Sequence, residues 1–355
     1  MSSSCNQHLG VRCLRAVSVS ADVLLCASSL ALADEGGVAF WLTGQFGSLA
    51  ATPQQPGWSA ATIFFHTSDS AGGEVAAARQ ATIGRFNPTV NINLNANVNA
   101  HVDLDFLSAS YVFQQQVLGG QLAVGMAGAF GRNSTSIDGT LTASVGNLTS
   151  TRFGSIDDSR WGVADLYPQV TLRWNQGVSN YMVYMMGDLP VGTYDSSRLA
   201  NFGIGHGAID GGAGYTYFNP QTGHEFSVVS GLTFYNFTNN STDYQNGVDW
   251  HLDWGLSQFL SKQVHVGLVG YFYDQLTADR GAPLILGANL SRVAGIGPQI
   301  GYIVPLSKEY QGYFNIKGYK EFDASRRADG WNLWLTFVVS PAAPTETTPK
   351  RMLTK

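Results

Sequence analysis

The chain has 355 residues, of which 44% are hydrophobic, 12% aromatic and only 13% charged, with 41 Gly and a formal net charge of −5. So much apolar surface excludes disorder for most of the chain, and no run of about 18 apolar residues follows the N-terminus, which excludes spanning helices. The acidic balance without a basic stripe argues against binding of nucleic acid. A mean hydropathy of −0.02 with so little charge favours β structure in which apolar residues are evenly spread.

The N-terminus has the pattern of a secretory signal peptide. Arg12 and Arg15 precede a stretch of mostly small and apolar residues that ends in the A-x-A sequence of Ala31 and Ala33. This order of a basic region, an apolar region and a cleavage site predicts removal of residues 1–33. A disordered cytosolic leader is the alternative interpretation.

The cysteines agree with export. All three, Cys5, Cys13 and Cys26, lie within residues 1–33. A mature chain without cysteine forms no disulfide in an oxidising compartment and offers no thiolate for a metal or for catalysis. Leu25 fits poorly the small residue that a lipoprotein signal needs before its cysteine, so we do not interpret Cys26 as a lipidation site.

The first regular pattern of the mature chain is a strict alternation over residues 90–106. Asn91 begins a face of Asn, His and Asp residues, and Ile92 begins an apolar face of Ile, Leu, Ala, Val and Phe residues. A period of two is the pattern of a β-strand, and a helix would mix the two faces. The same alternation recurs around Asp249 and in the last ordered segment, where Trp331, Leu333 and Leu335 share a face.

About twelve such segments follow one another. They lie near residues 58–68, 98–114, 119–131, 161–175, 178–189, 207–218, 223–235, 246–259, 262–275, 290–304, 309–323 and 329–340. Short turn-like links alternate with longer links rich in Gly, Ser, Thr and Asp, which we place at 69–97, 132–160, 190–206, 236–245 and 276–289. Tight turns at one end, long loops at the other and an even strand number are typical of an outer-membrane barrel.

The predicted fold class is therefore all-β. We expect residues 34–340 to form a transmembrane antiparallel β-barrel of about 12 strands with short periplasmic turns and longer extracellular loops, in the outer membrane of a Gram-negative bacterium. Segments of 10 to 15 residues suit tilted strands, which need about 9–11 residues to cross. Residues 341–355, with three prolines and no apolar period, are predicted to be a disordered periplasmic tail.

A soluble β-sandwich or propeller is the competing fold. Its strands average roughly 5–6 residues, and the chain shows no repeat of blade length. The faces opposite the apolar ones carry Asn, Ser, Thr, Gly and Gln rather than Lys and Glu. This composition favours a water-lined lumen inside a lipid-facing wall.

The charged and aromatic residues that the alternation places inward are the candidate site. A charge that faces lipid at mid-bilayer costs ~2–4 kcal/mol for Arg or Lys, so charges inside strands are expected in the lumen. The predicted lumen-lining residues are Asp103, Asp105, Asp165, Arg173, Asp249, His251, Asp253, Tyr271, Lys317, Tyr319 and Glu321. Either these side chains line a solute path, or they are paired charges that brace the barrel wall.

The sequence contains no pattern that indicates catalysis, a cofactor or a metal. Ser144 comes nearest to a nucleophile elbow, but Thr142 occupies its first glycine position. A Gly-rich run at 203–212 lacks the surrounding strand, turn and helix of a dinucleotide site. His251 and Asp253 share a face and could hold a metal or a proton, or simply each other. We therefore predict neither an enzyme nor a bound cofactor.

Six short motifs resemble an outer-membrane family associated with the meta-pathway of phenol degradation. They are Gly84–Pro88, Asp165–Gln169, Gly203–Gly207, Ala213–Asn219, Gly223–Phe226 and Asp243–Gly247. The resemblance covers roughly residues 35–340 and implies an outer-membrane barrel, related in role to channels for long-chain fatty acids and aromatic hydrocarbons. It implies no catalytic residues and does not identify the solute.

Two functions remain open at this point. The first is a channel for passive uptake of small, hydrophobic or aromatic molecules, with membrane lipid and a small solute as partners and with Met185, Tyr273 and Trp334 among further inward side chains. The second is a structural or adhesive barrel that acts through its extracellular loops. The oligomeric state does not follow from the sequence.

Overall fold

The structure is a computed structural model that describes residues 39–71, 78–81, 90–145, 148–281 and 290–343. The predicted signal peptide and most of the predicted C-terminal tail lie outside these residues. The regular structure of the described part consists of strands, and it contains no helix that could cross a membrane. The strands are β1 (Gly57–Ala71), β2 (Ala78–Ala81), β3 (Val90–Val117), β4 (Gly120–Val145), β5 (Leu148–Gln176), β6 (Ser179–Gly187), β7 (Ala208–Phe218), β8 (His224–Asn236), β9 (Asp249–Phe259), β10 (Val264–Gln275), β11 (Arg292–Pro305), β12 (Tyr310–Ser325) and β13 (Asp329–Pro341).

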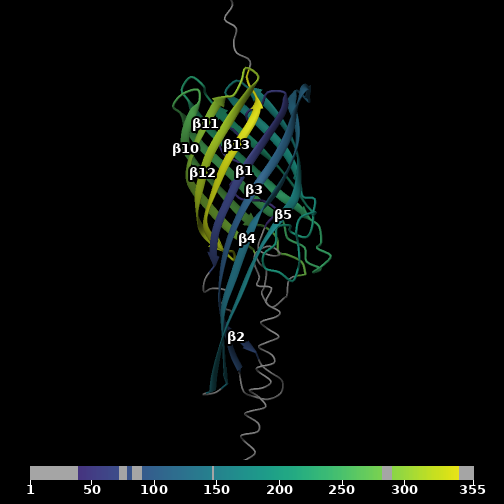
Figure 1. Cartoon of the computed structure of the whole chain (residues 1–355), viewed down its shortest axis with the longest axis vertical. Helices are drawn as coiled ribbons and strands as arrows, with labels where there is room; N and C mark the ends of the chain where they lie inside the picture. The colour runs from purple at the N-terminus through teal and green to yellow at the C-terminus, as the bar shows by residue number, and fades with distance from the viewer. Residues whose placement is uncertain (1–38, 72–77, 82–89, 146–147, 282–289, 344–355) are drawn as a thin grey trace, which may run out of the picture.

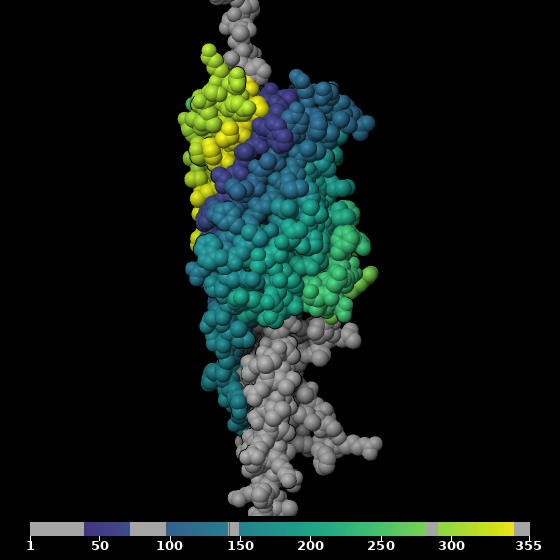
Figure 2. Space-filling view, turned by 45° about the vertical axis from the view of Figure 1, so that its right-hand side comes forward, coloured from purple at the N-terminus to yellow at the C-terminus, as the bar shows by residue number. Residues whose placement is uncertain are grey.

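The strands form a closed antiparallel barrel of 12 strands (Figure 1). Each barrel strand pairs with its sequence neighbours, and β1 closes the ring because it pairs with β13 on one side and with β3 on the other. In Figure 2 the yellow surface of β13 lies beside the purple surface of β1. The short β2 pairs only with β3 and stands outside the ring. The predicted fold is confirmed.

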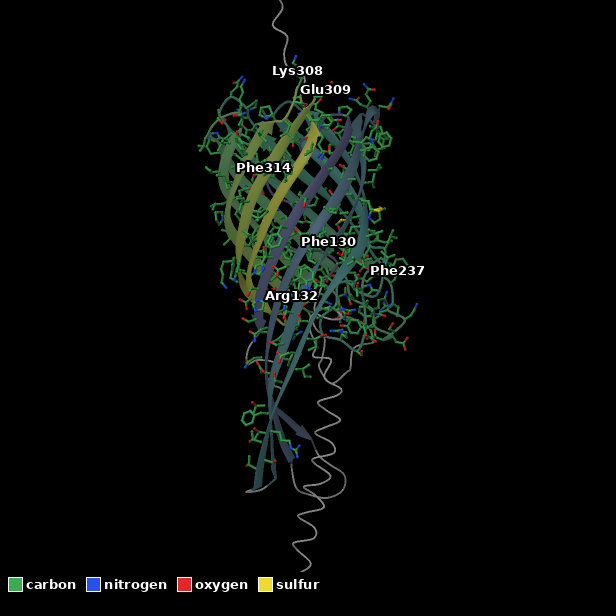
Figure 3. All side chains as sticks on the ribbon, viewed as in Figure 1. Phe130, Arg132, Phe237, Lys308, Glu309 and Phe314 are labelled. Carbon is green, nitrogen blue, oxygen red and sulfur yellow. The ribbon has the colours of Figure 1, made fainter. Side chains whose placement is uncertain are left out.

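The two ends of the barrel differ in the length of their connections. Tight turns join β3 to β4 and β5 to β6, and Gly119 and Gly177 there adopt positive φ values of 71° and 68°, which glycine tolerates best. Lys308 and Glu309 lie in another short turn at the same end (Figure 3). This end is periplasmic by the usual asymmetry of outer-membrane barrels.

The alternation along each strand separates an apolar outer wall from a mostly polar interior. On β13, Trp331 is 46% exposed on the outer face, whereas its neighbour Asn332 is 2% exposed and points inward. Ile296, Ile300 and Ile316 similarly expose apolar side chains on the outside of β11 and β12. The exposed apolar wall suits contact with lipid chains, and the inward polar groups bond to one another.

Two predicted loops are strands in the structure. β3 already begins at Val90, β4 continues to Val145, and β5 begins at Leu148, so most of 132–160 and the end of 69–97 are β-sheet. These three strands extend past the rest of the barrel, where β2 joins them (Figure 1). The loop interpretation was wrong because the ladder between β3 and β4 continues in register from Val112 back to Val90, beyond the length that a membrane crossing needs.

Candidate functional site

Residues 39–56, which we call the plug segment, lie inside the barrel before β1 begins. They form no strand, yet Trp41 and Ala51 are almost fully buried. Their hydrogen-bond partners come from β4, β7, β8, β9, β11 and β12, on different sides of the ring. The plug segment therefore occupies the lumen and runs from its middle to its periplasmic end.

Two oppositely charged side chains hold the centre of the plug segment. Asp253 on β9 accepts hydrogen bonds from the backbone N–H groups of Gly44 at 3.1 Å and Phe46 at 3.0 Å. Lys317 on β12 donates from Nζ to the carbonyl oxygens of Gly44, Gln45 and Phe46 at 2.6, 2.9 and 3.1 Å. We call Asp253 and Lys317 the clamp. Each ion is buried, and each is satisfied by the peptide backbone.

Glycine is required at one position of the plug segment. Gly44 has a φ of +81°, and a Cβ there would lie 2.9 Å from the ring of Tyr319. The Tyr319 hydroxyl donates to the Gly44 carbonyl at 3.1 Å. The close approach of backbone and ring is possible because position 44 carries no side chain.

Polar side chains also contact the backbone nearer the periplasmic end. Glu225 accepts from the Leu49 N–H at 2.9 Å, and the Thr216 hydroxyl accepts from the Ala51 N–H at 3.0 Å. Gln121 accepts from the N–H of Gln54 and donates to its carbonyl. Buried backbone groups need partners, and the lumen wall supplies them along the plug segment.

Trp41 anchors the other end of the plug segment. Its ring stacks on His251 with centroids 3.5 Å apart and an interplanar angle of 13°. His251 Nε2 lies 3.0 Å from a carboxylate oxygen of Asp210, to which the Thr233 hydroxyl also donates at 2.8 Å. The sequence paired His251 with Asp253, but in the structure its acidic partner is Asp210 on β7.

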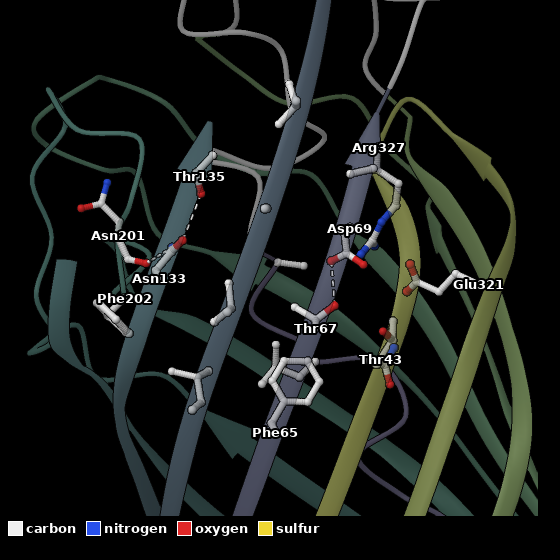
Figure 4. A pocket seen from close by; sticks show the side chains of 18 of the residues that line it. Thr43, Phe65, Thr67, Asp69, Asn133, Thr135, Asn201, Phe202, Glu321 and Arg327 are labelled. Atoms are coloured by element: carbon white, nitrogen blue, oxygen red, sulfur yellow. Dashed lines mark hydrogen bonds between the residues drawn. The ribbon is translucent and has the colours of Figure 1, made fainter. Parts of the chain in front are cut away.

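A cavity of about 160 Å³ lies beyond Trp41, in the extracellular half of the lumen. Residues 39 and 41–43 of the plug segment form one side of it. The apolar part of its wall includes Phe65, Val98, Val102, Leu104 and Phe202, with Ala100 between the valines. Figure 4 shows Phe65 and Phe202 facing this space from different parts of the chain.

Most polar groups of this cavity are hydrogen-bonded to the wall, and among the described residues one oxygen of Asp69 makes no hydrogen bond. Asn133 accepts from Thr135 and donates to the Asn201 carbonyl. Both oxygens of Glu321 are engaged, by the Tyr271 hydroxyl at 2.6 Å and by the Gly330 N–H at 3.0 Å. Apolar walls around a few fixed polar groups are the usual composition of a small-molecule pocket.

Nine of the eleven predicted lumen residues do face the interior. The structure brings Asp253, Lys317 and Tyr319 together at the plug segment, and Tyr271 with Glu321 at the cavity. The others serve separate places. Asp165 accepts from the N–H groups of Gly192 and Ile204 and so fixes the connection between β6 and β7, Arg173 donates to Thr171 on its own strand, and Asp249 is buried at the start of β9.

The prediction for Asp103 and Asp105 was wrong. Leu104 between them is buried against the cavity, so both carboxylates point outward. Asp103 bonds to His66 at 2.7 Å on the outer surface, with 46% of its side chain exposed. The polar face of this strand is external because β3 leaves the lipid region, which Arg132, opposite Asp103 on β4, also marks (Figure 3). Met185, 52% exposed, is likewise outside.

The sequence interpretation missed the plug segment and Asp210. Residues 39–56 carry no alternation, so a search for strands passes over them. The one available signal is composition, since Phe40, Trp41 and Phe46 are large apolar residues that a solvent-exposed leader would not need. Among the described residues no group of three or more His, Cys, Asp or Glu side chains could hold a metal ion.

The fold and lumen define a class of protein. A closed 12-stranded barrel with an apolar outer wall, short turns at one end and a polar interior is an outer-membrane β-barrel of Gram-negative bacteria. The chain belongs to the family described as "Putative MetA-pathway of phenol degradation", whose sequence profile matches residues 66–337. No curated protein sequence matches the chain.

Comparison with solved structures supports the same fold. The COG4313 outer membrane channel from Pseudomonas putida F1 superposes with a TM-score of 0.58 at 12% identity, over 83% of this chain and 100% of that one. A Pseudomonas aeruginosa FadL homologue gives a TM-score of 0.38 at 9% identity, over 84% of this chain and 95% of that one. The second likeness is too weak to carry an argument, and the first shows that this chain has the fold of an outer-membrane channel.

Proposed function

We propose that the protein is a channel for passive uptake of small apolar molecules, of about the size of one aromatic ring, across the outer membrane. The observation that carries this proposal is the cavity beyond Trp41. A cavity of ~150 Å³ has room for benzene in an engineered protein, and the lumen cavity measures about 160 Å³, with apolar side chains on part of its wall and Asp69, Glu321 and Arg327 on another part. The proposal assigns no catalytic residue and no cofactor.

The arrangement of the lumen supports a path in two stages. An apolar solute enters the cavity from the extracellular side, where Phe65 and Phe202 offer it contact in place of water. Further movement requires displacement of the plug segment, which hydrogen bonds and one ring stack hold in the lumen and which is covalently joined to the wall only where residue 56 meets β1. The solute then follows its own concentration gradient.

Filling the cavity tests the proposal. Ala100 on β3 lines the cavity, and Ala109 on the same strand is exposed on the outer wall. We expect Ala100→Phe to reduce uptake of benzyl alcohol or toluene into proteoliposomes several-fold, whereas Ala109→Phe leaves uptake at the parent level. Equal uptake by both variants and the parent would show that the solute does not use this cavity.

The alternative of a structural or adhesive barrel rests on the extension of β3, β4 and β5. Phe153 in this extension is 81% exposed, and β6 pairs with β5 only from Gln169 onward. Shortening β4 and β5 to a tight turn beyond the paired residues Asp138 and Ser155 removes Phe153 but keeps Thr135 at the cavity, and so separates the two functions. If the protein is a channel, this variant keeps the uptake rate of the parent. If the protein is an adhesive barrel, the variant loses its binding to surfaces.

A further inference from the structure

We propose that the lumen is a binding track for a peptide with turns at Gly44 and Leu49, and that the plug segment is a resident ligand that a peptide added in trans can replace. The proposal goes beyond uptake, because it concerns what the wall recognises rather than what passes through it. It assigns a ligand class to the inner faces of β4, β7, β8, β9 and β12.

The wall recognises the plug segment mainly through its backbone. Side chains accept from the backbone N–H groups of five plug residues, which are Gly44, Phe46, Leu49, Ala51 and Gln54. Side chains donate to the carbonyl oxygens of Gly44, Gln45, Phe46 and Gln54. Backbone groups are the same in every sequence, so these contacts select a peptide by its backbone path, which turns at Gly44 and at Leu49.

Two positions add sequence requirements. The stack on His251 calls for an aromatic residue at position 41, and the close approach of Tyr319 calls for glycine at position 44. Ser48 adds a hydroxyl contact to Ser257 and Gln299. The preferred ligand is therefore a peptide with an aromatic residue three positions before a glycine at which the backbone turns.

The peptide bond that joins the plug segment to β1 lies outside the contacts that hold the plug segment in the lumen. The plug segment reaches β1 through residues 53–56, where Pro53, Gln54 and Pro56 are exposed at the periplasmic end. Gly57 then begins the ladder with β3. A cut between Pro56 and Gly57 thus interrupts no strand pairing and leaves the contacts of residues 41–54 in place.

A cleavable barrel provides the experiment. A protease recognition sequence is inserted between Pro56 and Gly57, the folded protein is cut in detergent, and gel filtration with mass spectrometry follows the fragment. We expect the fragment to remain with the barrel and to be replaced by excess fluorescein-labelled synthetic peptide of residues 39–56, measured by fluorescence anisotropy. A second variant that lacks residues 39–52 should bind the same peptide directly.

Modified peptides separate backbone recognition from side-chain recognition. N-methylation of Phe46 removes the N–H that bonds to Asp253, and hydrogen bonds to charged groups are strong enough to predict at least about tenfold weaker binding. Gln45→Ala keeps every backbone contact and should bind within about threefold of the parent peptide. In the Asp253→Asn barrel, the gap between N-methylated and parent peptides should shrink.

Three results would overturn the proposal: release of the fragment on cleavage, no exchange with the labelled peptide, or a larger loss for Gln45→Ala than for N-methylation. The proposed uptake fails separately, through Ala100→Phe. A barrel that exchanges the peptide but takes up solute equally with and without a filled cavity retains the peptide track and loses the transport proposal.

Discussion

The two halves of the lumen satisfy their polar groups in different ways. In the extracellular half, the polar side chains around the cavity bond to one another, as Asn133 does with Thr135, and carbon atoms form most of the remaining wall. In the periplasmic half, charged side chains such as Asp253 and Lys317 bond to the plug segment. Most polar groups of the first half are satisfied by the wall, with one oxygen of Asp69 as an exception, whereas those of the second half are satisfied by a peptide.

This difference indicates that the contacts of the clamp with the plug segment keep the channel closed. Buried charges without partners cost several kcal/mol each, so departure of the plug segment exposes Asp253 and Lys317 to that cost unless water enters. The cavity differs because most of its polar groups bond to the wall itself, and among them one oxygen of Asp69 makes no hydrogen bond within the described residues. Changes to the clamp should therefore alter opening, and changes to the cavity should alter which solute binds.

The largest effect is expected from Lys317→Met. The variant removes three charge-assisted hydrogen bonds to the plug segment, each worth about 1.5–3 kcal/mol. We expect the plug segment to leave the lumen and single-channel conductance in planar bilayers to rise several-fold.

Lys320→Met is the matched control for this prediction. Lys320 lies on the same strand but is exposed on the outer wall and donates to the Gly330 carbonyl rather than to the plug segment. Its conductance should equal that of the parent. If Lys317→Met conducts no better than Lys320→Met, the comparison between the two halves fails, because the clamp would not control opening.

A second prediction concerns the wall that encloses both halves. Leu335 is exposed to lipid on β13, and Thr336 points into the lumen opposite Ile63. Leu335→Arg places a charge in the lipid region and should lower the free energy of unfolding by ~2–4 kcal/mol. Thr336→Arg should cost less, because its side chain can reach water inside the barrel.

Heat-modifiable gel mobility measures this difference. The folded form of Leu335→Arg should disappear at a lower temperature than that of Thr336→Arg. Identical melting of the two variants would mean that neither face of β13 contacts lipid. A lower melting temperature for Thr336→Arg would mean that the inner and outer faces of β13 are exchanged, so that the lumen would not be where we place it.

Local alternation was sufficient to predict the barrel and the faces of most strands. On β13 the expected outward Trp331 and inward Trp334 are both confirmed. The rule works there because each face of this strand keeps the same surroundings along its length. The same rule failed at Asp103 on β3. Where a strand continues beyond the membrane, water lies outside as well as inside, so a polar side chain no longer identifies the lumen.

The clamp illustrates what sequence could not supply about the site. Asp253 and Lys317 were both predicted to face the lumen, but nothing in their strands indicates a common partner, since that partner is a segment without periodicity more than 200 residues away. The link between His251 and Asp210 is similar. Long-range contacts within a lumen depend on strand register around the whole ring, which alternation alone leaves undetermined.

The smallest expected effect concerns ion preference. The lumen carries more buried carboxylates than basic side chains among its described residues, including Asp165, Asp249 and Asp253, so an open pore should prefer cations weakly. A unit charge ~10 Å from an ion in water contributes about 0.4 kcal/mol, or about a factor of two in permeability. Asp249→Asn combined with Asp253→Asn should lower the cation preference by about that factor per charge, measured as reversal potential across a salt gradient.

Asp103→Asn is the control that tests whether charges on the outer face of the wall affect the ion preference as charges on the inner face do. It removes the same charge, but from the outer surface beside His66, where the wall and mobile ions screen it from the pore within about 8 Å at physiological salt. Its reversal potential should match that of the parent. A shift as large as that of the double variant would mean that surface charge sets the preference, and an anion-selective parent would mean that the buried carboxylates are neutralised by the plug segment and their hydrogen-bond partners.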